Sequence, residues 1–441
     1  MKLADVYAQT PLKGDRRPDL GLRSEPFKQA VIGEIPESWA AVGFEECLEP
    51  EVRHVVGKLQ TNAYASAGRY PIIDQGQTPV AGYTDDESLA YRGPLPVVIF
   101  GDHTRVFKFV SEAFVLGADG TKILHPNGNR VDARFFYYAL TRLSIPSRGY
   151  NRHYKLLREQ WLAIPGTMEE QQTIAAVLSK IQAAVEAQDK IIATLKELKA
   201  ATMAKLFHEG LRGEPLKQTA IGEVPQSWEL WSLESIGKLV TGTTPATSRP
   251  EYYGDDVPFI SPGDIGDGRL VRKAEKKLSR LGVDVSRPLP ARTVLVVCIG
   301  STIGKVGMTT ASVSCTNQQI NAIICKEEFI PECIYYIMVW NSDRVRTLST
   351  PSPVPILSKG TFAKGVIAVP SDKYEQEKIA QVLCAIDDRI EKAEEKRDTL
   401  KTLFSSMLHL LMTGQVRVTS LMVDGSRGRP VHNRLKEVFT Q

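Results

Sequence analysis

The chain has 441 residues, 42% of them hydrophobic and 24% charged, a composition that fits a folded protein of two to four domains and excludes a disordered or collagen-like chain. No apolar stretch reaches about 18 residues, so the sequence predicts no membrane-spanning helix. The 55 Lys and Arg residues exceed the 51 Asp and Glu residues by only 4, so total charge does not by itself indicate a nucleic-acid partner.

The first 20 residues are polar and contain no apolar core, so we expect an N-terminal extension and not a secretory signal. The six cysteines form no C-x-x-C pair, and four of them lie in apolar runs. Cysteines of this kind are typical of small buried side chains in a reducing compartment. These features predict a cytoplasmic protein.

A 19-residue segment occurs twice in the chain. Gly21–Trp39, GLRSEPFKQAVIGEIPESW, returns as Gly210–Trp228, GLRGEPLKQTAIGEVPQSW, with 13 identical positions at an offset of 189. We expect the two tryptophans to be core anchors and not base-stacking residues. A repeat of this length indicates duplicated structural units.

A second repeat follows each copy of the first. Glu170–Ala175 matches Glu375–Ala380 at an offset of 205, and the two inserts between the paired repeats, residues 40–165 and 229–370, have diverged. The expected order is an extension (1–20), a lead-in segment with variable domain 1 (21–165), a conserved helix (166–209), a second lead-in segment with variable domain 2 (210–370), a second conserved helix (371–415) and a basic tail (416–441).

Both conserved helices carry apolar residues at alternating steps of four and three, the a/d pattern of a coiled coil. In the second helix only Arg397 interrupts this seam, and in the first helix three members are polar: Gln188, Lys199 and Thr202. Gly210 and Gly414 stand where C-terminal caps are expected. Because a helix of about 40 residues must bury such a stripe, we predict an antiparallel coiled coil within the chain. A coiled coil that joins two chains is the alternative.

The variable domains alternate strand-like runs with Gly, Pro and Asp turns, which predicts mixed α/β domains. The expected strands are 70–73, 96–100, 106–110, 257–260, 294–299 and 320–324, and the expected helices are 133–143 and 331–341. Both domains contain a strand, a glycine, a polar run and a strand, at 96–110 and 295–309. The predicted fold is therefore α+β, with two mixed α/β domains separated by two long antiparallel coiled-coil helices in a pseudo-twofold internal repeat.

Each variable domain has one basic block. Residues 130–158 hold seven basic side chains against one acidic side chain, and residues 269–292 hold eight against two, so each block has a net charge of +6. Such blocks can bind the phosphates of DNA, although a solvated basic face is an equal alternative for either block alone.

Catalytic signatures are missing. Residues 300–306 resemble a P-loop, but only three residues separate the glycines and Val306 replaces the magnesium-binding Ser or Thr. Asp264, Glu275 and Lys277 match a metal-dependent nuclease triad loosely, while Glu275–Lys277 also fits a charged helix face. We expect no catalytic residue and no metal site in this chain.

The duplicated G-E-[IV]-P-x-S-W segment, the E-Q-x-x-I-A start of each long helix and the diverged inserts together resemble the specificity subunit of a Type I restriction–modification enzyme. Further matches are YPIIDQG (70–76), PFISPGDI (258–265), GSTIGKVG (300–307), TNQQINAII (316–324) and IAVP (367–370). The resemblance covers roughly residues 20–415, and the basic tail Thr419–Gln441 departs from it.

The resemblance implies two target-recognition domains that bind double-stranded DNA, with no catalysis in this chain. It implies two methyltransferase subunits, which use S-adenosylmethionine, and restriction subunits that translocate and cut with ATP and magnesium. Two unlike readers on a helical spacer are expected to recognise a bipartite, asymmetric DNA site with an unread gap.

The candidate DNA-binding residues are polar, cationic or aromatic loop residues, because such side chains can read base edges or contact phosphates. In domain 1 they are Gln75, Gln77, Tyr83, His103, Thr104, Arg105, Arg148, Tyr150, Arg152 and Lys155. In domain 2 they are Arg249, Ser301, Thr302, Lys305, Ser352 and Lys359. Asn317, Gln318 and Gln319 are further candidates, with a structural hydrogen-bonding role as an equal alternative.

Two other functions stay open from the residues alone. One is a metal-dependent DNA endonuclease centred on Asp264, Glu275 and Lys277. The other is a coiled-coil adaptor that does not bind DNA.

Overall fold

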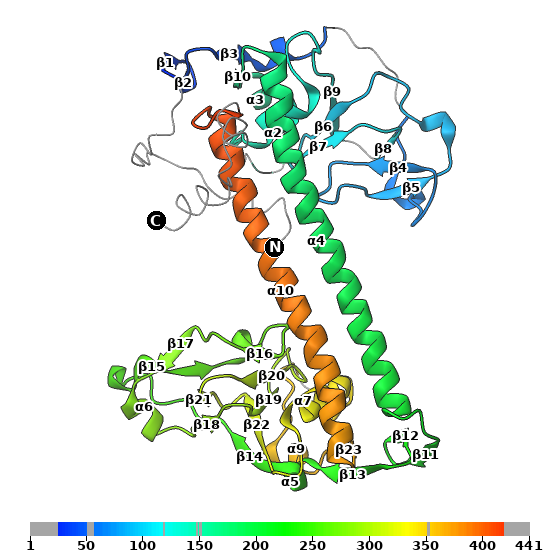
Figure 1. The fold of residues 1–441 in the computed structure, drawn as a ribbon, viewed down its shortest axis with the longest axis vertical. Helices are drawn as coiled ribbons and strands as arrows, with labels where there is room; N and C mark the ends of the chain where they lie inside the picture. Colours follow the sequence, from blue (N-terminus) through cyan, green and yellow to red (C-terminus); the bar gives the residue numbers. More distant parts are fainter. Residues whose placement is uncertain are drawn as a thin grey trace, which may run out of the picture. The chain divides into compact units, whose positions relative to one another are not determined.

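The computed structural model describes residues 25–50, 57–117, 120–146, 149, 152–350 and 353–418. The chain divides into two compact units, one drawn from Met1–Glu186 and Asp398–Gln441 and the other from Ala187–Arg397. Each unit contains one variable domain and a part of both long helices (Figure 1). In the described part of the chain, no helix has the length and hydropathy needed to cross a bilayer.

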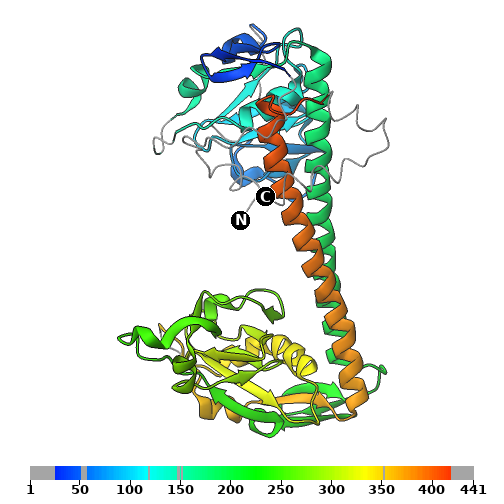
Figure 2. The same cartoon turned by 60° about the vertical axis from the view of Figure 1, so that its left-hand side comes forward.

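The two long helices are α4 (Met168–Glu209) and α10 (Lys373–Met412), and they lie side by side in Figures 1 and 2. In the second unit three ion pairs join them: Asp189–Arg397 at 3.8 Å, Lys196–Glu394 at 3.0 Å and Lys199–Asp387 at 2.7 Å. Residue numbers rise along α4 as they fall along α10, so the helices are antiparallel. The predicted pairing of the helices within one chain is confirmed.

The predicted seam is the buried face of both helices. Ile379, Leu383 and Leu411 of α10 and Ile174 and Leu178 of α4 are at most 1% exposed. Two polar interruptions of the seam, Lys199 and Arg397, are each paired with a carboxylate of the other helix, which offsets part of the cost of burying their charge. The expected caps are present, because Gly210 and Gly414 have φ values of +68° and +67°.

The duplicated lead-in segments form β-hairpins and are not plain linkers. The first hairpin is β1 (Phe27–Ala30) with β2 (Gly33–Pro36), and the second is β11 (Leu216–Thr219) with β12 (Gly222–Pro225). Each has a two-residue turn followed by a glycine with positive φ, +99° at Gly33 and +106° at Gly222. Their registers are the same after the offset of 189, because Ala30 pairs with Gly33 as Thr219 pairs with Gly222.

Each variable domain is closed by a strand pair that joins its beginning to its end. In domain 1 this closing pair is β3 (Ala40–Gly43) with β10 (Trp161–Ile164), and in domain 2 it is β13 (Trp228–Ser232) with β23 (Val366–Pro370). Ile164 pairs with Ala40, and Val369 pairs with Glu229, so the two registers agree after the offsets of 205 and 189. The duplication therefore preserves the base of each domain residue by residue.

Domain 1 contains two three-stranded sheets, in the orders β5-β4-β8 and β7-β6-β9. Their strands are β4 (Tyr70–Ile73), β5 (Gly82–Thr84), β6 (Val97–Gly101), β7 (Phe107–Val110), β8 (Val115–Leu116) and β9 (Thr121–Leu124). The helices are α2 (Ala133–Thr141) and α3 (Tyr154–Arg158). Strands β4, β6 and β7 and helix α2 lie within two residues of their predicted bounds.

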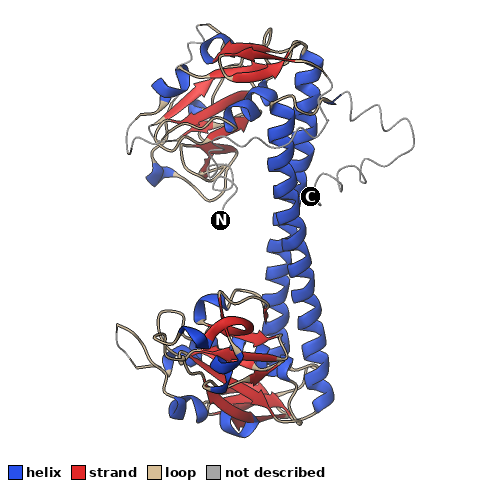
Figure 3. Ribbon diagram, turned by 90° about the vertical axis from the view of Figure 1, so that its left-hand side faces the viewer, coloured by secondary structure: helices blue, strands red, loops and turns tan. Residues whose placement is uncertain are grey.

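Domain 2 has a five-stranded sheet, β14-β22-β19-β20-β16, and a four-stranded sheet, β17-β15-β21-β18. The strands are β14 (Gly237–Thr241), β15 (Tyr253–Ile260), β16 (Leu270–Val271), β17 (Lys276–Leu278), β18 (Leu289–Pro290), β19 (Val294–Val297), β20 (Val306–Thr309), β21 (Val313–Thr316) and β22 (Ile320–Cys325). The helices are α5 (Leu233–Ile236), α6 (Arg280–Asp284), α7 (Pro331–Trp340), α8 (Ser342–Thr347) and α9 (Lys359–Ala363). Figure 3 shows the mixture of strands and short helices.

The two variable domains share a core topology despite their divergence. In both, a hairpin carries a third antiparallel strand, β7-β6-β9 in domain 1 and β20-β19-β22 in domain 2. Both also contain a parallel strand pair, with Ile72 opposite Val115 and Phe259 opposite Cys315. The mixed α/β fold predicted from the sequence is confirmed.

The glutamine of each E-Q motif fastens a variable domain to its long helix. Gln171 and Gln376 are about equally buried, each 2% exposed. Gln171 donates hydrogen bonds to the carbonyls of Arg130 and Pro165 at 3.1 and 3.2 Å. Gln376 donates to the carbonyl of Pro370 at 2.9 Å, the position equivalent to Pro165. Each side chain also accepts from the backbone N–H just before α2 or α7.

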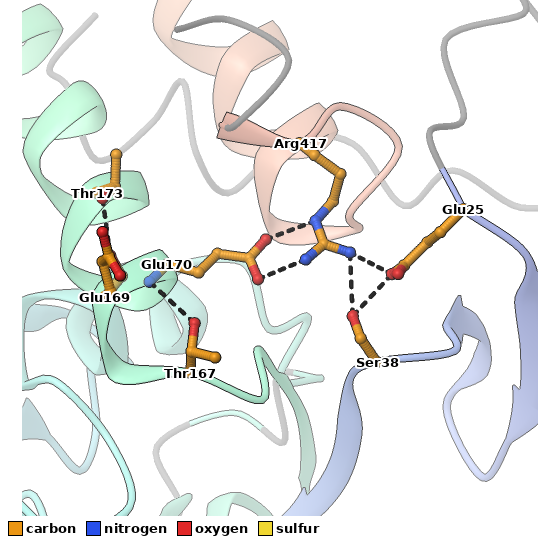
Figure 4. Close-up of polar contacts among 7 residues, drawn as sticks. All are labelled: Glu25, Ser38, Thr167, Glu169, Glu170, Thr173 and Arg417. Atoms are coloured by element: carbon orange, nitrogen blue, oxygen red, sulfur yellow. Dashed lines mark hydrogen bonds and ion pairs between the residues drawn. The ribbon is translucent and has the colours of Figure 1, made fainter. Parts of the chain in front are cut away.

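Arg417, beyond the end of α10, closes the first unit (Figure 4). Its guanidinium donates two hydrogen bonds of 2.6 Å to Glu170 of α4, and it also donates to Glu25 and, at 3.0 Å, to Ser38. In the second unit the equivalent carboxylate, Glu375, accepts instead from the backbone that follows α4, at Leu211. Glu170 therefore receives its hydrogen bonds from the Arg417 side chain, whereas Glu375 receives one from the backbone that continues directly from α4.

The remaining core expectations also hold. Trp39 and Trp228 are 1% and 2% exposed, so both are core anchors. The six cysteines are free, and four of them are buried. Burial raises the pKa of the Cys47 thiol to about 12, which keeps it protonated and apolar at neutral pH.

Candidate nucleic-acid interface

The two hairpins predicted to carry polar tips have equivalent surroundings. In domain 1 the backbone N–H of Asp102 donates to the carbonyl of Gly120 at 2.7 Å, and in domain 2 that of Cys298 donates to Gln319 at 2.8 Å. The carbonyls of Asp102 and Cys298 in turn accept from the loop that precedes α3 or α9. In each domain, therefore, three loops meet at one hairpin tip. The candidates His103, Thr104, Arg105, Arg152, Ser301, Thr302 and Lys305 lie on these loops.

In domain 1 three of the candidates brace one another. The Thr104 hydroxyl donates to the carbonyl of Gln75 at 2.6 Å, and the backbone N–H of His103 donates to the Gln75 side-chain oxygen at 3.4 Å. All three residues are half-buried, whereas Gln77 in the same loop is exposed. Gln75 and Thr104 thus shape the tip, while the Gln77 side chain is available to a ligand.

Arg105 shapes the tip as well. It has a φ of +63°, which is unusual for a residue other than glycine. Its guanidinium donates to the carbonyl of Ile145 at 2.8 Å, so the side chain ties the hairpin to the loop that leads towards α3. An arginine held by this hydrogen bond shapes the hairpin tip, and its guanidinium is already engaged within the domain.

Sequence reasoning missed Asp102, the residue that organises the tip of domain 1. Its buried carboxylate accepts from the backbone N–H groups of His153 and Tyr154 at 2.8 and 2.7 Å. This interaction caps the start of α3 and fixes the neighbouring Arg152 and Lys155, both of which are exposed. Two signals were available in the sequence. Asp102 directly follows a buried strand, and no Ser, Thr, Asp or Asn directly precedes the helical run YKLLR to cap it.

In domain 2 the tip carries exposed hydroxyls. Ser301 and Thr302 are exposed, whereas Lys305 is half-buried. The Gly300 N–H donates to the carbonyl of Pro355 at 3.0 Å, which holds the tip against the loop that precedes α9. Ser301 and Thr302 are therefore free to face a ligand on a fixed backbone.

The run Asn317–Gln319 lies beside this tip and divides into two roles. The Asn317 amide donates to the Gln319 side-chain oxygen at 2.9 Å, so these two half-buried residues satisfy each other. Gln318 is exposed and accepts a hydrogen bond from the exposed Thr244. A structural role suits Asn317 and Gln319, and Gln318 extends the polar rim of the tip.

Helix α9 is the counterpart of α3, because Tyr154–Arg158 and Lys359–Ala363 are related by the offset of 205. Lys359, the first residue of α9, is exposed. The predicted cations Arg152, Lys155 and Lys359 thus belong to the same part of the two domains.

The other candidates are not brought to the tips by any contact in the described residues. Tyr83 lies on β5 opposite Pro71, and the exposed Arg249 precedes a short 3-10 helix and lies 5.8 Å from the Tyr252 ring. Arg148, Tyr150 and Ser352 fall outside the described residues.

The basic blocks are less available than their net charge suggests. Arg130 and Arg158 pair with Glu46 and Glu45, and Arg142 donates to the carbonyl of Met412, so three cations of the first block are engaged inside the domain. In the second block Arg269, Arg272 and Arg292 pair with carboxylates. The net charge of each block therefore overstates the number of unpaired cations, and the phosphate-binding role of the blocks stays a prediction.

The loose nuclease triad is a structural feature of a turn. One oxygen of Asp264 accepts from the backbone N–H and the hydroxyl of Ser261 at 2.8 and 2.6 Å, and the other accepts from the N–H of Glu275 at 2.8 Å. The segment after Glu275 is the strand β17 and not the helix face expected, because Leu278 is fully buried against β15. The described residues contain no cluster of three His, Cys, Asp or Glu side chains suited to a metal.

Each of the two diverged α/β domains thus has a polar hairpin tip and packs against parts of both long helices. Residues 225–402 match the family model described as the Type I restriction modification DNA specificity domain. Over these residues the chain is similar to Type I restriction enzyme specificity subunits.

Two relatives and one solved structure show the same similarity. The putative type I restriction enzyme MjaX specificity subunit of Methanocaldococcus jannaschii is 24% identical over 433 residues, which cover 90% of this chain and 98% of that protein. The HindI specificity subunit of Haemophilus influenzae is 35% identical over 153 residues, 34% of this chain and 33% of that one. The crystal structure of a Type-I restriction-modification system S subunit from M. genitalium has a TM-score of 0.63 at 14% identity, covering 85% of this chain and 96% of that one, and so shares the fold.

Proposed function

We propose that this chain recognises a bipartite, asymmetric DNA site, with each variable domain reading one half, and that partner subunits supply the chemistry. The partners would be two methyltransferase subunits with S-adenosylmethionine and restriction subunits that use ATP and magnesium. Double-stranded DNA is then the ligand of the two hairpin tips.

One observation carries this proposal: the two domains have the same tip architecture and different tip side chains. The Asp102 and Cys298 positions make equivalent backbone contacts, but Gln77, Arg152 and Lys155 stand on one tip and Ser301 and Thr302 on the other. Two tips with the same backbone contacts but different hydrogen-bond donors and acceptors are suited to reading two different base sequences.

Exposed apolar residues of α4 offer a surface for a helical partner. Ala187, Ile191, Leu198 and Ala201 are exposed residues of α4 outside the seam positions, and Ile191 and Leu198 are 46% and 48% exposed. These residues follow a second heptad-like spacing, which suits the apolar face of another helix. We assign this stripe to a methyltransferase subunit.

The test is to map methylated adenines across the genome of a host that expresses the chain with its methyltransferase. The proposal predicts one bipartite motif whose methylation disappears when the chain is deleted. Methylation that persists without the chain would contradict the proposal. A methylated motif that is continuous and has no unread gap would also contradict it.

Co-purification separates the alternatives. A complex with a methyltransferase in which two copies of that subunit join one copy of this chain is expected. Magnesium-dependent cutting by the purified chain alone would favour the endonuclease hypothesis instead.

A further inference from the structure

Domain 2 contains an added strand that reaches the long helix. Strand β16 pairs in parallel with β20 at the edge of the five-stranded sheet. The corresponding sheet of domain 1 ends at β7 and has no such outer strand among the described residues. The addition lies directly on the hairpin whose tip carries Ser301 and Thr302.

Two arginines at the ends of β16 bind one face of α10. Arg269 contacts Asp388 at 3.2 Å, and Arg272 donates two hydrogen bonds to Glu391 at 2.6 and 2.8 Å. Asp388 and Glu391 are three residues apart and therefore neighbours on the helix surface. The Arg272 pair is bidentate, which fixes its direction as well as its distance. We call these two pairs the ionic latch.

A buried contact lies beside the ionic latch. The Tyr336 hydroxyl of α7 donates to Asp387 at 2.6 Å, and Lys199 of α4 contacts the other oxygen of the same carboxylate at 2.7 Å. Strand β16 and helix α7 of domain 2, together with α4, thus converge on residues 387–391 of α10.

Domain 1 is attached by neutral groups at the equivalent place. The Tyr138 hydroxyl donates to Gln182 at 3.0 Å, and Gln182 is the counterpart of Asp387 at the offset of 205. The counterpart of Asp388 is Ala183, which cannot bind an arginine. The counterpart of Glu391 is Glu186, which accepts a hydrogen bond from Gln182 at 3.1 Å. In the described part of domain 1, no arginine forms the equivalent of the ionic latch.

We propose that Arg269 and Arg272 are positioning residues that fix the angle of the β19–β20 hairpin on α10 and thereby set how strictly the complex measures the gap between its two half-sites. The connection is short. The carbonyl of Arg269 accepts from the N–H of Met308 on β20 at 2.9 Å, and that of Val271 accepts from the Thr310 hydroxyl at 3.0 Å. A shift of β16 along α10 is thus transmitted to β20 and to the tip.

This inference rests on the proposed function, and its test uses the assembled methyltransferase with DNA duplexes that carry the mapped half-sites. Three duplexes are compared, with the native gap, one base pair more and one base pair fewer. For Arg272→Glu we expect the preference for the native gap to fall by about fivefold or more, because a bidentate pair is replaced by a repulsion. The double variant Arg272→Glu with Glu391→Arg restores the pair and is expected to restore the preference.

Lys273→Ala is the matched control. Lys273 is exposed, lies next to Arg272 and has no ion pair among the described contacts, so its removal is expected to leave the gap preference unchanged. If Arg272 contacts DNA phosphate instead, Arg272→Glu would weaken all three duplexes equally and the charge exchange would not rescue it. That result would overturn the inference.

Hydrogen exchange separates this inference from the proposed function. In the complex without DNA, Arg272→Glu is expected to speed exchange at the β16 and β20 amides, and the charge exchange is expected to slow it again. If the complex recognises a bipartite site but Arg272→Glu changes neither the gap preference nor the amide exchange, the role of the ionic latch is refuted and the proposed function stands. A complex with the exchange effect but no bipartite site refutes the proposed function.

Discussion

The side-chain oxygen of Gln376 accepts a hydrogen bond from the backbone N–H of Ile330 at 2.9 Å, just as Gln171 accepts one from Asp132 at 2.8 Å. Ile330 and Asp132 are the residues that precede α7 and α2, so one amide at the start of each long helix holds the start of a domain helix. The repeated glutamine, Gln171 or Gln376, therefore joins each long helix to its variable domain by hydrogen bonds.

Gln376→Ala should destabilise the second unit. The change leaves the Ile330 N–H and the Pro370 carbonyl buried without their partner, and we expect a loss of about 2–4 kcal/mol in the free energy of opening. Faster hydrogen exchange in the first turn of α7 would report it. Gln381→Ala, at an exposed position of α10, is the control and should change stability by less than about 0.5 kcal/mol. Equal exchange in the two variants would contradict the role given to Gln376.

Arg417→Met should loosen the first unit and leave the second unchanged. Without the guanidinium, the carboxylates of Glu25 and Glu170, which are 24% and 10% exposed, face one another without a cation. We expect a loss of roughly 2–4 kcal/mol, measured as faster amide exchange in β1 and β2.

Arg130→Met is the control for this variant. Its pair with Glu46 is more than half exposed on both sides, and such pairs contribute little. The role of Arg417 fails if the two variants behave alike, or if the second unit loosens as much as the first.

Arg152→Ala should weaken DNA binding by the assembled complex. Removing one phosphate contact is expected to make the plot of log affinity against log salt concentration shallower by about one unit. Arg158→Ala is a suitable comparison, because Glu45 already neutralises that side chain at 2.5 Å. An affinity and slope identical to those of the parent complex would remove Arg152 from the interface.

The ionic latch should weaken in acid. The hydrogen bond from Arg272 lowers the pKa of Glu391, against a smaller opposing effect of burial. A carboxylate with a lowered folded-state pKa stabilises the fold above its ordinary value of 4.5 and loses that contribution as the pH falls through the lowered value.

The stability difference between the parent chain and Glu391→Gln should therefore be present at pH 7 and decline as the pH falls from 4.5 through the lowered pKa. Because both side chains are partly exposed, the difference should be at most about 1 kcal/mol. Thermal unfolding at several pH values measures it, and a difference that grows in acid would contradict the assignment.

The sequence was most informative where its pattern repeats. The offsets of 189 and 205 and the a/d spacing from Ile379 to Leu411 predicted the duplicated units and the antiparallel helix pair, because helical periodicity and burial depend on local spacing. Strand β4 follows its apolar run closely for the same reason. The lead-in hairpins were not predicted, since the turns before Gly33 and Gly222 lack the Asn-Gly type of signal.

Contacts between residues that are distant in the chain could not be predicted from the sequence. The pairs of Arg272 with Glu391 and of Arg292 with Glu332 span 119 and 40 residues, so the count of charges in one block could not reveal that they are neutralised. The buried Asp102 was overlooked beside the more conspicuous His103, Thr104 and Arg105. Its partner His153 is 51 residues away, and only the fold brings them together.

The matched registers of the two closing pairs have a consequence for how such proteins change over generations. Two stretches of chain with different sequences, each beginning and ending on such strands, form the same closing pair. Each domain is in this sense a cassette. If each domain reads one half of the site as proposed, replacing one cassette changes one half-site and leaves the closing pair of the other domain as it is.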